Sequence, residues 1–309
     1  MTDVVCLGIL VADVIARPVG DLPPRGALAV VDEVSLHGGG CALNTASVLR
    51  RLGLASTVVG KVGADPLGDL LLRLLDERGI DRGGVLRDED VPTSATVVLV
   101  DPEGERTFLH LPGANGNLSP EELEEGRLFS GRALHVAGAL VLPRLDGEPT
   151  AAVLREAKAH GLTTSLDPVW DPTGRWDRLL PSLPHLDLFV PSLAEGSAVS
   201  GRSDPEGVAA WLRERGVGVV ALKLGPEGCF LSSDGYEGYV AAPAVKAVDG
   251  TGAGDAFAAG LLYGHLAGWP VERSAVLANA AGALATTAVG AVEGVPGLGE
   301  TLALSASAE

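Results

Sequence analysis

Residues 249–257 have the sequence Asp249-Gly250-Thr251-Gly252-Ala253-Gly254-Asp255-Ala256-Phe257. This stretch runs directly into an apolar segment that we expect to be helical. Glycines let the backbone turn so that successive amides point into one cavity. A helix start adds unpaired N–H groups and the positive end of the helix dipole, and both stabilise a phosphoryl anion. The stretch therefore predicts an anion-binding segment at the start of a helix, here called the glycine loop (residues 249–255).

Asp255 is an acidic residue at a position where a bound phosphoryl anion would repel it. A carboxylate there indicates a chemical role, and we interpret Asp255 as a general base that takes a proton from a hydroxyl as the phosphoryl group arrives. The simpler alternative is that Asp255 only caps the helix. Three glycines within five residues are an unfavourable way merely to begin a helix, so we favour the base.

Two better-known glycine motifs are missing from the sequence. No Gly-Lys-Ser or Gly-Lys-Thr run exists, and no Gly-x-Gly-x-x-Gly follows the first expected strand. The chain therefore has neither a Walker-type phosphate loop nor the dinucleotide-binding fingerprint.

The composition describes an acidic, globular chain of 309 residues, of which 46% are hydrophobic. That length suits one large α/β domain with an appendage or two modest domains, and the apolar content excludes global disorder. The net charge of −17 repels phosphodiester backbones and anionic lipids. We therefore expect neither nucleic acid nor a membrane as a partner.

The cysteines and the N-terminus indicate a cytoplasmic protein. Cys6, Cys41 and Cys229 are scattered and lack metal-ligand spacing, which predicts free thiols in a reducing compartment. The N-terminus has no basic region before its apolar run, so it does not resemble a secretory signal. Residues 274–292 are apolar but rich in Ala, Gly and Thr, which favours a buried helix that continues into a loop over a membrane span.

The hydrophobic pattern predicts alternating strands and helices along most of the chain. The expected strands lie at residues 4–10, 27–36, 58–62, 96–100, 106–111, 133–137, 163–167, 186–190, 217–223, 229–232 and 239–242. The expected helices lie at residues 41–52, 66–78, 149–160, 193–200, 205–215, 253–267 and 271–288. After residue 120 the alternation has the lengths of βαβ units, which indicates an α/β fold with a parallel sheet.

Two early strands, at residues 27–36 and 96–100, do not fit this alternation. Both carry apolar residues on both faces, and a small sheet of this kind must be covered on each side. One side can close over a ligand while the other meets a second subunit. We therefore expect a lid formed by approximately residues 14–36 and 94–112, and a homodimer that associates through it.

A second motif lies near the N-terminus, where residues 39–44 read Gly39-Gly40-Cys41-Ala42-Leu43-Asn44. Together with the glycine loop, this motif resembles the signatures of the ribokinase-like (PfkB-type) carbohydrate kinase family, over nearly the whole chain. The resemblance implies a Rossmann-like αβα sandwich with a small β-sheet lid, built by residues 1–309 as a single domain. It also implies a phosphotransferase that moves the γ-phosphate of ATP to an alcohol group of a sugar or nucleoside, with Mg²⁺ and often a monovalent cation.

The resemblance assigns roles to individual residues. Asp255 matches the catalytic base, and the amides of Gly252, Ala253 and Gly254 match the anion hole. The residues that match the family's substrate site are Asp13, Gly39, Gly40 and Asn44. Considered without the resemblance, Asp13 has the alternative of a turn residue and Asn44 that of a helix cap.

The nucleotide site is implied by a second group of positions. Lys223, Gly225 and Gly228 match the strand and turn that border the adenosine, and Asn279 matches a residue beside the base. Thr251 of the glycine loop is assigned to the same nucleotide site. The alternative for Gly225 and Gly228 is a simple hairpin turn.

Two metal sites are implied as well. Glu195 matches a residue that orders Mg²⁺ through water, although Ser192 stands where the family usually has asparagine. The residues that match the family's K⁺ site are Asp249, Thr251 and the carbonyl groups of Ala285, Ala288 and Gly290. Gly294 stands where a hydroxyl-bearing residue often completes that site, so K⁺ activation stays open.

The substrate is the least determined part of the interpretation. Arg106, on the expected lid hairpin, and Asn115 are candidate substrate contacts, with a solvated arginine as the alternative for Arg106. Trp170 and Trp176 follow an expected strand and can stack on a sugar or a base, or pack in the core. A sugar kinase is our leading hypothesis, a nucleoside kinase is the nearest alternative, and a ligand-binding regulator without turnover is an alternative of another class.

Overall fold

The computed structural model describes residues 2–305, and these form an α/β fold with two separate sheets. The larger sheet has nine strands in the order β13-β12-β11-β10-β9-β8-β1-β4-β5. Their bounds are β1 Val4–Gly8, β4 Ser56–Gly63, β5 Asp81–Asp88, β8 Ala133–Ala139, β9 Thr163–Pro168, β10 Leu188–Phe189, β11 Val219–Lys223, β12 Cys229–Ser232 and β13 Glu237–Val240. Strands β5 to β11 pair in parallel, and β12 and β13 add an antiparallel edge. The predicted parallel sheet is confirmed.

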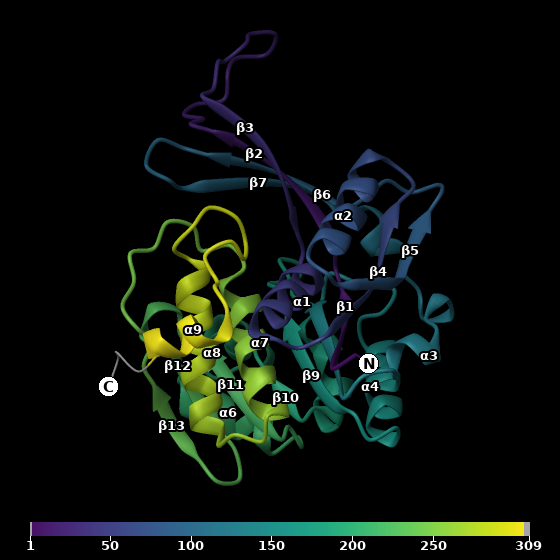
Figure 1. Cartoon of the computed structure of the whole chain (residues 1–309), viewed down its shortest axis with the longest axis vertical. Helices are drawn as coiled ribbons and strands as arrows, with labels where there is room; N and C mark the ends of the chain where they lie inside the picture. Colours follow the sequence, from purple (N-terminus) through teal and green to yellow (C-terminus); the bar gives the residue numbers. More distant parts are fainter. Residues whose placement is uncertain (1, 306–309) are drawn as a thin grey trace.

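Helices cover both faces of the nine-stranded sheet (Figure 1). One face packs against α1 Cys41–Leu52, α2 Pro66–Glu77, α7 Ala253–Leu266, α8 Val271–Ala285 and α9 Leu298–Ser305. The other packs against α4 Glu148–Ala159, α5 Leu193–Ser200 and α6 Pro205–Arg213, with the short α3 Glu125–Leu128 at its edge. Parallel strands buried on both faces read as continuous apolar runs, which is why they were visible in the sequence. None of the helices in residues 2–305 has both the length and the apolar content to cross a bilayer.

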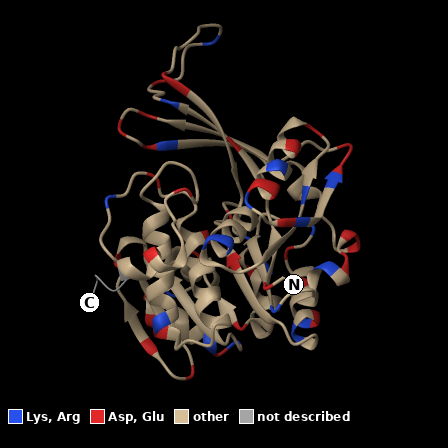
Figure 2. Ribbon diagram, in the orientation of Figure 1, with Lys and Arg blue, Asp and Glu red and all other residues tan. Residues whose placement is uncertain are grey.

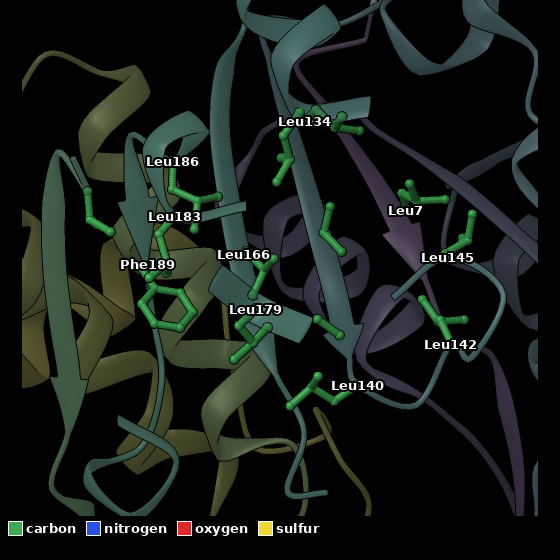
Figure 3. Close-up of a cluster of buried hydrophobic side chains, with 14 of the residues drawn as sticks. Leu7, Leu134, Leu140, Leu142, Leu145, Leu166, Leu179, Leu183, Leu186 and Phe189 are labelled. Carbon is green, nitrogen blue, oxygen red and sulfur yellow. The ribbon is translucent and has the colours of Figure 1, made fainter. Parts of the chain in front are cut away.

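The core on the α4 side is built almost entirely from aliphatic residues. Figure 3 shows Leu7, Leu134 and Leu166 on neighbouring strands, in the same buried cluster as Leu179 and Leu183 of a 3-10 helix at Trp176–His185. Each of these side chains is at most 3% exposed. Burial of one leucine side chain contributes about 1.5–3 kcal/mol to the stability of the fold. This layer therefore keeps the strands rigid, and the polar residues at the strand ends have fixed positions.

The smaller sheet has four strands in the order β3-β2-β6-β7: β2 Val11–Arg17, β3 Glu33–Gly39, β6 Ala95–Val100 and β7 Arg106–Leu111. Figure 1 shows it standing away from the larger sheet. The hairpin β6–β7 is confirmed. The strand expected at residues 27–36 begins only at Glu33 and continues to Gly39.

Several predicted boundaries were wrong. The strand expected at residues 4–10 ends at Gly8, and β2 at Val11–Arg17 was not among the expected strands. Strand β5 was missed because Asp81, Gly83 and Gly84 give it little strand propensity, and its pairing with β4 decides its conformation. Helix α8 ends at Ala285 rather than at residue 288.

The two faces of the smaller sheet differ in chemistry. Leu36, Val14, Val97 and Leu109 are paired in register across the four strands, and they form an apolar row that we call the outer face. On this face Leu36 is 47% and Leu109 61% exposed. The opposite, inner face carries the row His37, Asp13, Thr96 and His110. Charged residues of these strands lie mainly at the end farthest from the larger sheet (Figure 2).

Candidate active site

The glycine loop ends in the first turn of α7, as its sequence predicts. Gly252 is the N-cap of α7 with φ +75°, and a Cβ at this position would overlap the carbonyl oxygen of Ala291. Only glycine combines this backbone conformation with this close approach. The first bond of the helix joins Ala256 N to Gly252 O at 2.9 Å, so the amide of Gly254 lies ahead of the helical ladder.

Asp255 is in the first turn of α7 and is only 8% exposed. Asn44 of α1, 211 residues away in the sequence, donates from Nδ2 to Asp255 Oδ2 at 2.8 Å. Burial raises the pKa of Asp255, while hydrogen bonds from Asn44 and the Cys41 thiol, and the charge of Lys223, act to lower it. The structure therefore surrounds this carboxylate with groups that favour its charged form.

Asn44 has a second feature that the sequence did not reveal. Its Oδ1 atom is buried and has no hydrogen-bond partner in the described structure. A buried acceptor without a donor costs about 1–3 kcal/mol. A ligand hydroxyl is one group that would satisfy it.

Asp13 lies on β2, on the inner face of the smaller sheet. Burial raises the pKa of Asp13 to about 6, against a hydrogen bond from the Thr96 hydroxyl. A Cβ at Gly39 would overlap Asp13 Oδ2, so the glycine motif at residues 38–40 packs directly on this carboxylate. The structure thus brings two of the predicted substrate positions, Asp13 and Gly39, into contact.

A cavity of about 340 Å³ lies between the smaller sheet and the glycine loop. The sheet contributes Asp13, Thr96 and Phe108, and the other wall comes from residues 248–251 and 289–291. This volume is at the lower end of the range for small-molecule sites. A ligand of the size of a small sugar fits it.

Arg106 crosses from β7 to the glycine loop. Its Nη1 donates to Asp249 Oδ1 at 2.7 Å and also to the Thr251 hydroxyl. Asp249 Oδ2 accepts from the Gly290 amide at 3.2 Å. Although burial opposes it, hydrogen bonds from Thr251 and Gly290, together with Arg106, hold the pKa of Asp249 below its ordinary value. Arg106 therefore ties the smaller sheet to the loop, although its side chain is still 33% exposed.

A buried ionic cluster lies under the first turn of α7, and part of it was missed from the sequence. Lys223, the last residue of β11, places its Nζ 2.6 Å from Asp167 Oδ1 on β9. Burial raises the pKa of Asp167, and Glu195 and Asp255 add to this effect while Lys223 opposes it. The available signal for Asp167 was its place at the carboxyl end of a predicted parallel strand, where open α/β sheets bind ligands.

Glu195 and Ser192 form a capping box at the start of α5. Ser192 N donates to Glu195 Oε2 at 2.7 Å, and Glu195 N donates to Ser192 Oγ at 3.3 Å. Serine and asparagine are both favoured N-cap residues. Ser192, which stands where asparagine was expected, therefore still caps the start of α5. Ser192 also bridges to Lys223, which brings Glu195 to the ionic cluster.

Other predicted site residues have structural contacts. Asn115 accepts from Leu10 N at 3.1 Å and donates to Leu10 O at 2.8 Å. Both ends of its amide hold the chain between β1 and β2, so we do not carry Asn115 forward as a substrate contact. Asn279 donates to Val240 O at 2.8 Å and so holds the end of β13.

The turn at Gly225 and Gly228 has the geometry of a hairpin connection. Gly225 has φ +64° and Gly228 has φ +104°, and a Cβ at Gly228 would overlap Val240 O. The turn joins β11 to β12, so the structural alternative accounts for both glycines. Their contact with a nucleotide stays a prediction.

The two tryptophans lie close to each other beyond β9. The rings of Trp170 and Trp176 are tilted, with centroids 5.1 Å apart, and Trp170 is 53% exposed. Trp176 packs partly against the core. The core alternative therefore applies to Trp176, while Trp170 presents an open ring.

Comparisons with known proteins show the family to which the chain belongs. The model of the pfkB family carbohydrate kinases matches residues 1–297. The chain is 33% identical over 284 residues to the 2-dehydro-3-deoxygluconokinase of Bacillus subtilis, covering 88% of this chain and 87% of that protein. It is 36% identical over 273 residues to a fructokinase of Klebsiella pneumoniae, covering 84% and 88% of the two chains. The solved structure of a fructokinase with bound ATP from Xylella fastidiosa superposes with a TM-score of 0.84 at 25% identity and covers 99% of each chain. The chain therefore belongs to the PfkB family of carbohydrate kinases.

Proposed function

We propose that the chain transfers the γ-phosphate of ATP to a hydroxyl of a small sugar bound between the smaller sheet and the glycine loop. The observation that carries the proposal is the buried Asp255 carboxylate at the start of α7, hydrogen-bonded by Asn44 from α1. The cavity of sugar size is lined by Asp13 and by residues 249–251 of the glycine loop, and Asp255 follows four residues later, where the loop enters an anion-binding helix start. Family membership supports the same reaction.

The chain's own residues supply the proton transfer and the charge stabilisation. Asp255 accepts the proton of the attacking hydroxyl, and that oxygen forms a bond to the γ-phosphorus. The bond between the γ-phosphorus and the bridging oxygen breaks, and ADP leaves with the electron pair. In this proposal the amides of Gly252, Ala253 and Gly254 donate to the migrating phosphoryl group, as oxyanion donors worth about 3–4 kcal/mol each.

Substrate orientation falls to the acidic and amide groups of the smaller sheet and α1. Asp13 accepts hydrogen bonds from sugar hydroxyls, and the unpartnered Asn44 Oδ1 accepts another. Gly39 and Gly40 let the backbone pack closely on the Asp13 carboxylate and on the carbonyl group of Ile9, which fixes Asp13 in place. The smaller sheet acts as a lid, and Arg106 fastens it to the glycine loop.

Mg²⁺ fits this site as a metal held mainly by the nucleotide. Residues 2–305 contain no group of three His, Cys, Asp or Glu side chains arranged to hold a metal ion. Mg²⁺ is usually bound by substrate phosphates, several water molecules and one or two carboxylates. Glu195 would hold such an ion through one of its water molecules. When bound, Mg²⁺ neutralises charge on the phosphates.

The predicted site of a monovalent cation is already in contact with the Arg106 guanidinium. Asp249 and Thr251 would contribute side-chain oxygens, and Ala285, Ala288 and Gly290 carbonyl oxygens. Arg106 already donates to both Asp249 and Thr251. We propose that Arg106 supplies the positive charge there, so that K⁺ binds only when the lid opens.

We also propose a homodimer in a reducing, cytoplasmic compartment. The outer face of the smaller sheet is a continuous apolar row across four strands, of the kind that water-exposed sheets avoid. A second copy of the same face is a self-complementary cover. The three cysteines are unpaired, in agreement with a reducing environment.

The experiment is an ATP-consumption assay over pooled pentoses, hexoses, keto-sugar acids and nucleosides. A sugar kinase consumes ATP with a sugar or sugar acid, and a nucleoside kinase only with a nucleoside. Ligand binding without turnover would favour the regulator. Asp255→Asn should keep nucleotide binding but lose roughly 10²–10⁴-fold in turnover. Turnover within a factor of two of the unmodified chain would remove Asp255 from its role.

A further inference from the structure

Lys223 is a largely buried cation in contact with several acidic residues, which a position beside the adenosine does not explain. Its side chain is 17% exposed, and its Nζ lies 2.6 Å from the nearly buried Asp167. Burial alone would lower the pKa of Lys223, but Asp167, Glu195 and Asp255 together raise it. The amine therefore stays protonated and holds a permanent positive charge at the carboxyl end of β11.

The same side chain lies against the start of α7. A Cβ at Gly254 would stand 3.1 Å from Lys223 Nζ and 3.8 Å from its Cδ and Cε atoms. Glycine at position 254 thus leaves the space that the lysine occupies. The ammonium is consequently beside the amide that we assign to the anion hole.

The charges around Lys223 are unequal even before a ligand binds. Asp167, Glu195 and Asp255 provide three carboxylates, and Lys223 interacts with each of them. A phosphoryl group adds further negative charge to this poorly solvated site. Charges of one sign in a buried site are costly, so a cation in contact with the incoming group is required for it to bind.

We propose that Lys223 is a further catalytic residue, whose ammonium contacts the transferred phosphoryl group beside the Gly254 amide, and that Asp167 is the positioning residue that holds it there. The inference rests on the proposed function. Lys223 transfers no proton in this role. Its charge stabilises the phosphoryl oxygens as the bond to ADP breaks and the bond to the sugar oxygen forms.

A purely structural role gives a different expectation. If Lys223 only neutralises Asp167, then the double variant Asp167→Asn, Lys223→Met removes both charges together and should recover turnover. If Lys223 contacts the phosphoryl group, the double variant stays slow. Lys158 offers a matched control, because it makes a 2.7 Å ion pair with Asp187 outside the site.

The test combines turnover with the binding of a phosphoryl mimic. We expect Lys223→Met and the double variant to lose roughly 10²–10³-fold in kcat, the usual effect of removing one oxyanion donor. Both should bind ADP within threefold of the unmodified chain but lose affinity for ADP with aluminium fluoride by a factor similar to the kcat loss. Lys158→Met should change neither.

Three results would decide against the proposal. Recovery of kcat in the double variant, undiminished binding of the fluoride complex, or an equal loss of ADP and fluoride-complex affinity would each reject the phosphoryl contact. The thermal midpoint of the double variant shows whether it is folded. If the unmodified chain phosphorylated no acceptor, the proposed function would fail, and the fluoride measurement, which needs no acceptor, would still decide the role of Lys223.

Discussion

Replacement of Asn44 by leucine tests how the structure sets the charge of Asp255. Leucine has a similar size but cannot donate to Asp255 Oδ2, which accepts the Asn44 amide at 2.8 Å. Both residues are buried, at 3% and 8% exposure, so water cannot replace the lost bond. The Asp255 carboxylate then keeps only the support of Lys223 and Cys41.

The size of the effect follows from the strength of that bond. A hydrogen bond to a charged group contributes about 1.5–3 kcal/mol. One pKa unit corresponds to about 1.36 kcal/mol, so the pKa of Asp255 should rise by roughly 1–2 units. Because the base must be ionised, the loss of activity on the acid side should begin at a correspondingly higher pH. At acidic pH the turnover of the variant should be roughly 10–100-fold lower than that of the unmodified chain, and at alkaline pH it should approach the same plateau.

The measurement is the pH dependence of kcat at saturating ATP and sugar. Thr45→Val is the matched control, because Thr45 bonds the backbone oxygen of Asp255 and not its carboxylate. Its acid limb should stay in place. If Asn44→Leu lowered kcat by one constant factor at every pH, the argument that Asn44 sets the ionisation of Asp255 would be wrong.

Three further predictions follow from other contacts. Arg106→Ala frees Asp249, so added K⁺ should stimulate turnover severalfold more than in the unmodified chain, and equal K⁺ responses would contradict the competition. Leu36→Asp on the outer face should convert a dimer to a monomer in sedimentation. If the unmodified chain already sedimented as a monomer, the proposed homodimer would be wrong. Lys61→Met leaves the buried Asp88 carboxylate without the ammonium group that lies 3.0 Å from it. The free energy of unfolding in urea should fall by about 3–5 kcal/mol at neutral pH. The pKa of Asp88 is lowered in the folded chain, so its contribution to stability is present above the unfolded pKa and is lost as pH falls. The deficit of Lys61→Met should therefore shrink in acid.

The local features of the chain were readable from its sequence. Glycines, helix caps and apolar periodicity within a few residues determine four elements: the glycine loop, α1, α5 and the hairpin β6–β7. These signals can be read directly from the sequence. The base was visible for the same reason, since Asp255 and its glycines are neighbours in sequence. Strand β5 was not visible, because pairing with β4 outweighs its weak propensity.

Partnerships across the fold were decided only by the tertiary structure. Nothing local to Asn44 predicts that its amide reaches Asp255, and nothing local to Lys223 predicts that it faces Asp167 and Gly254. The sequence determined which residues carry the chemistry, through short-range backbone requirements. The packing of α1 and α7 on one sheet determined which of them meet, because contacts between distant segments depend on how buried surfaces fit together.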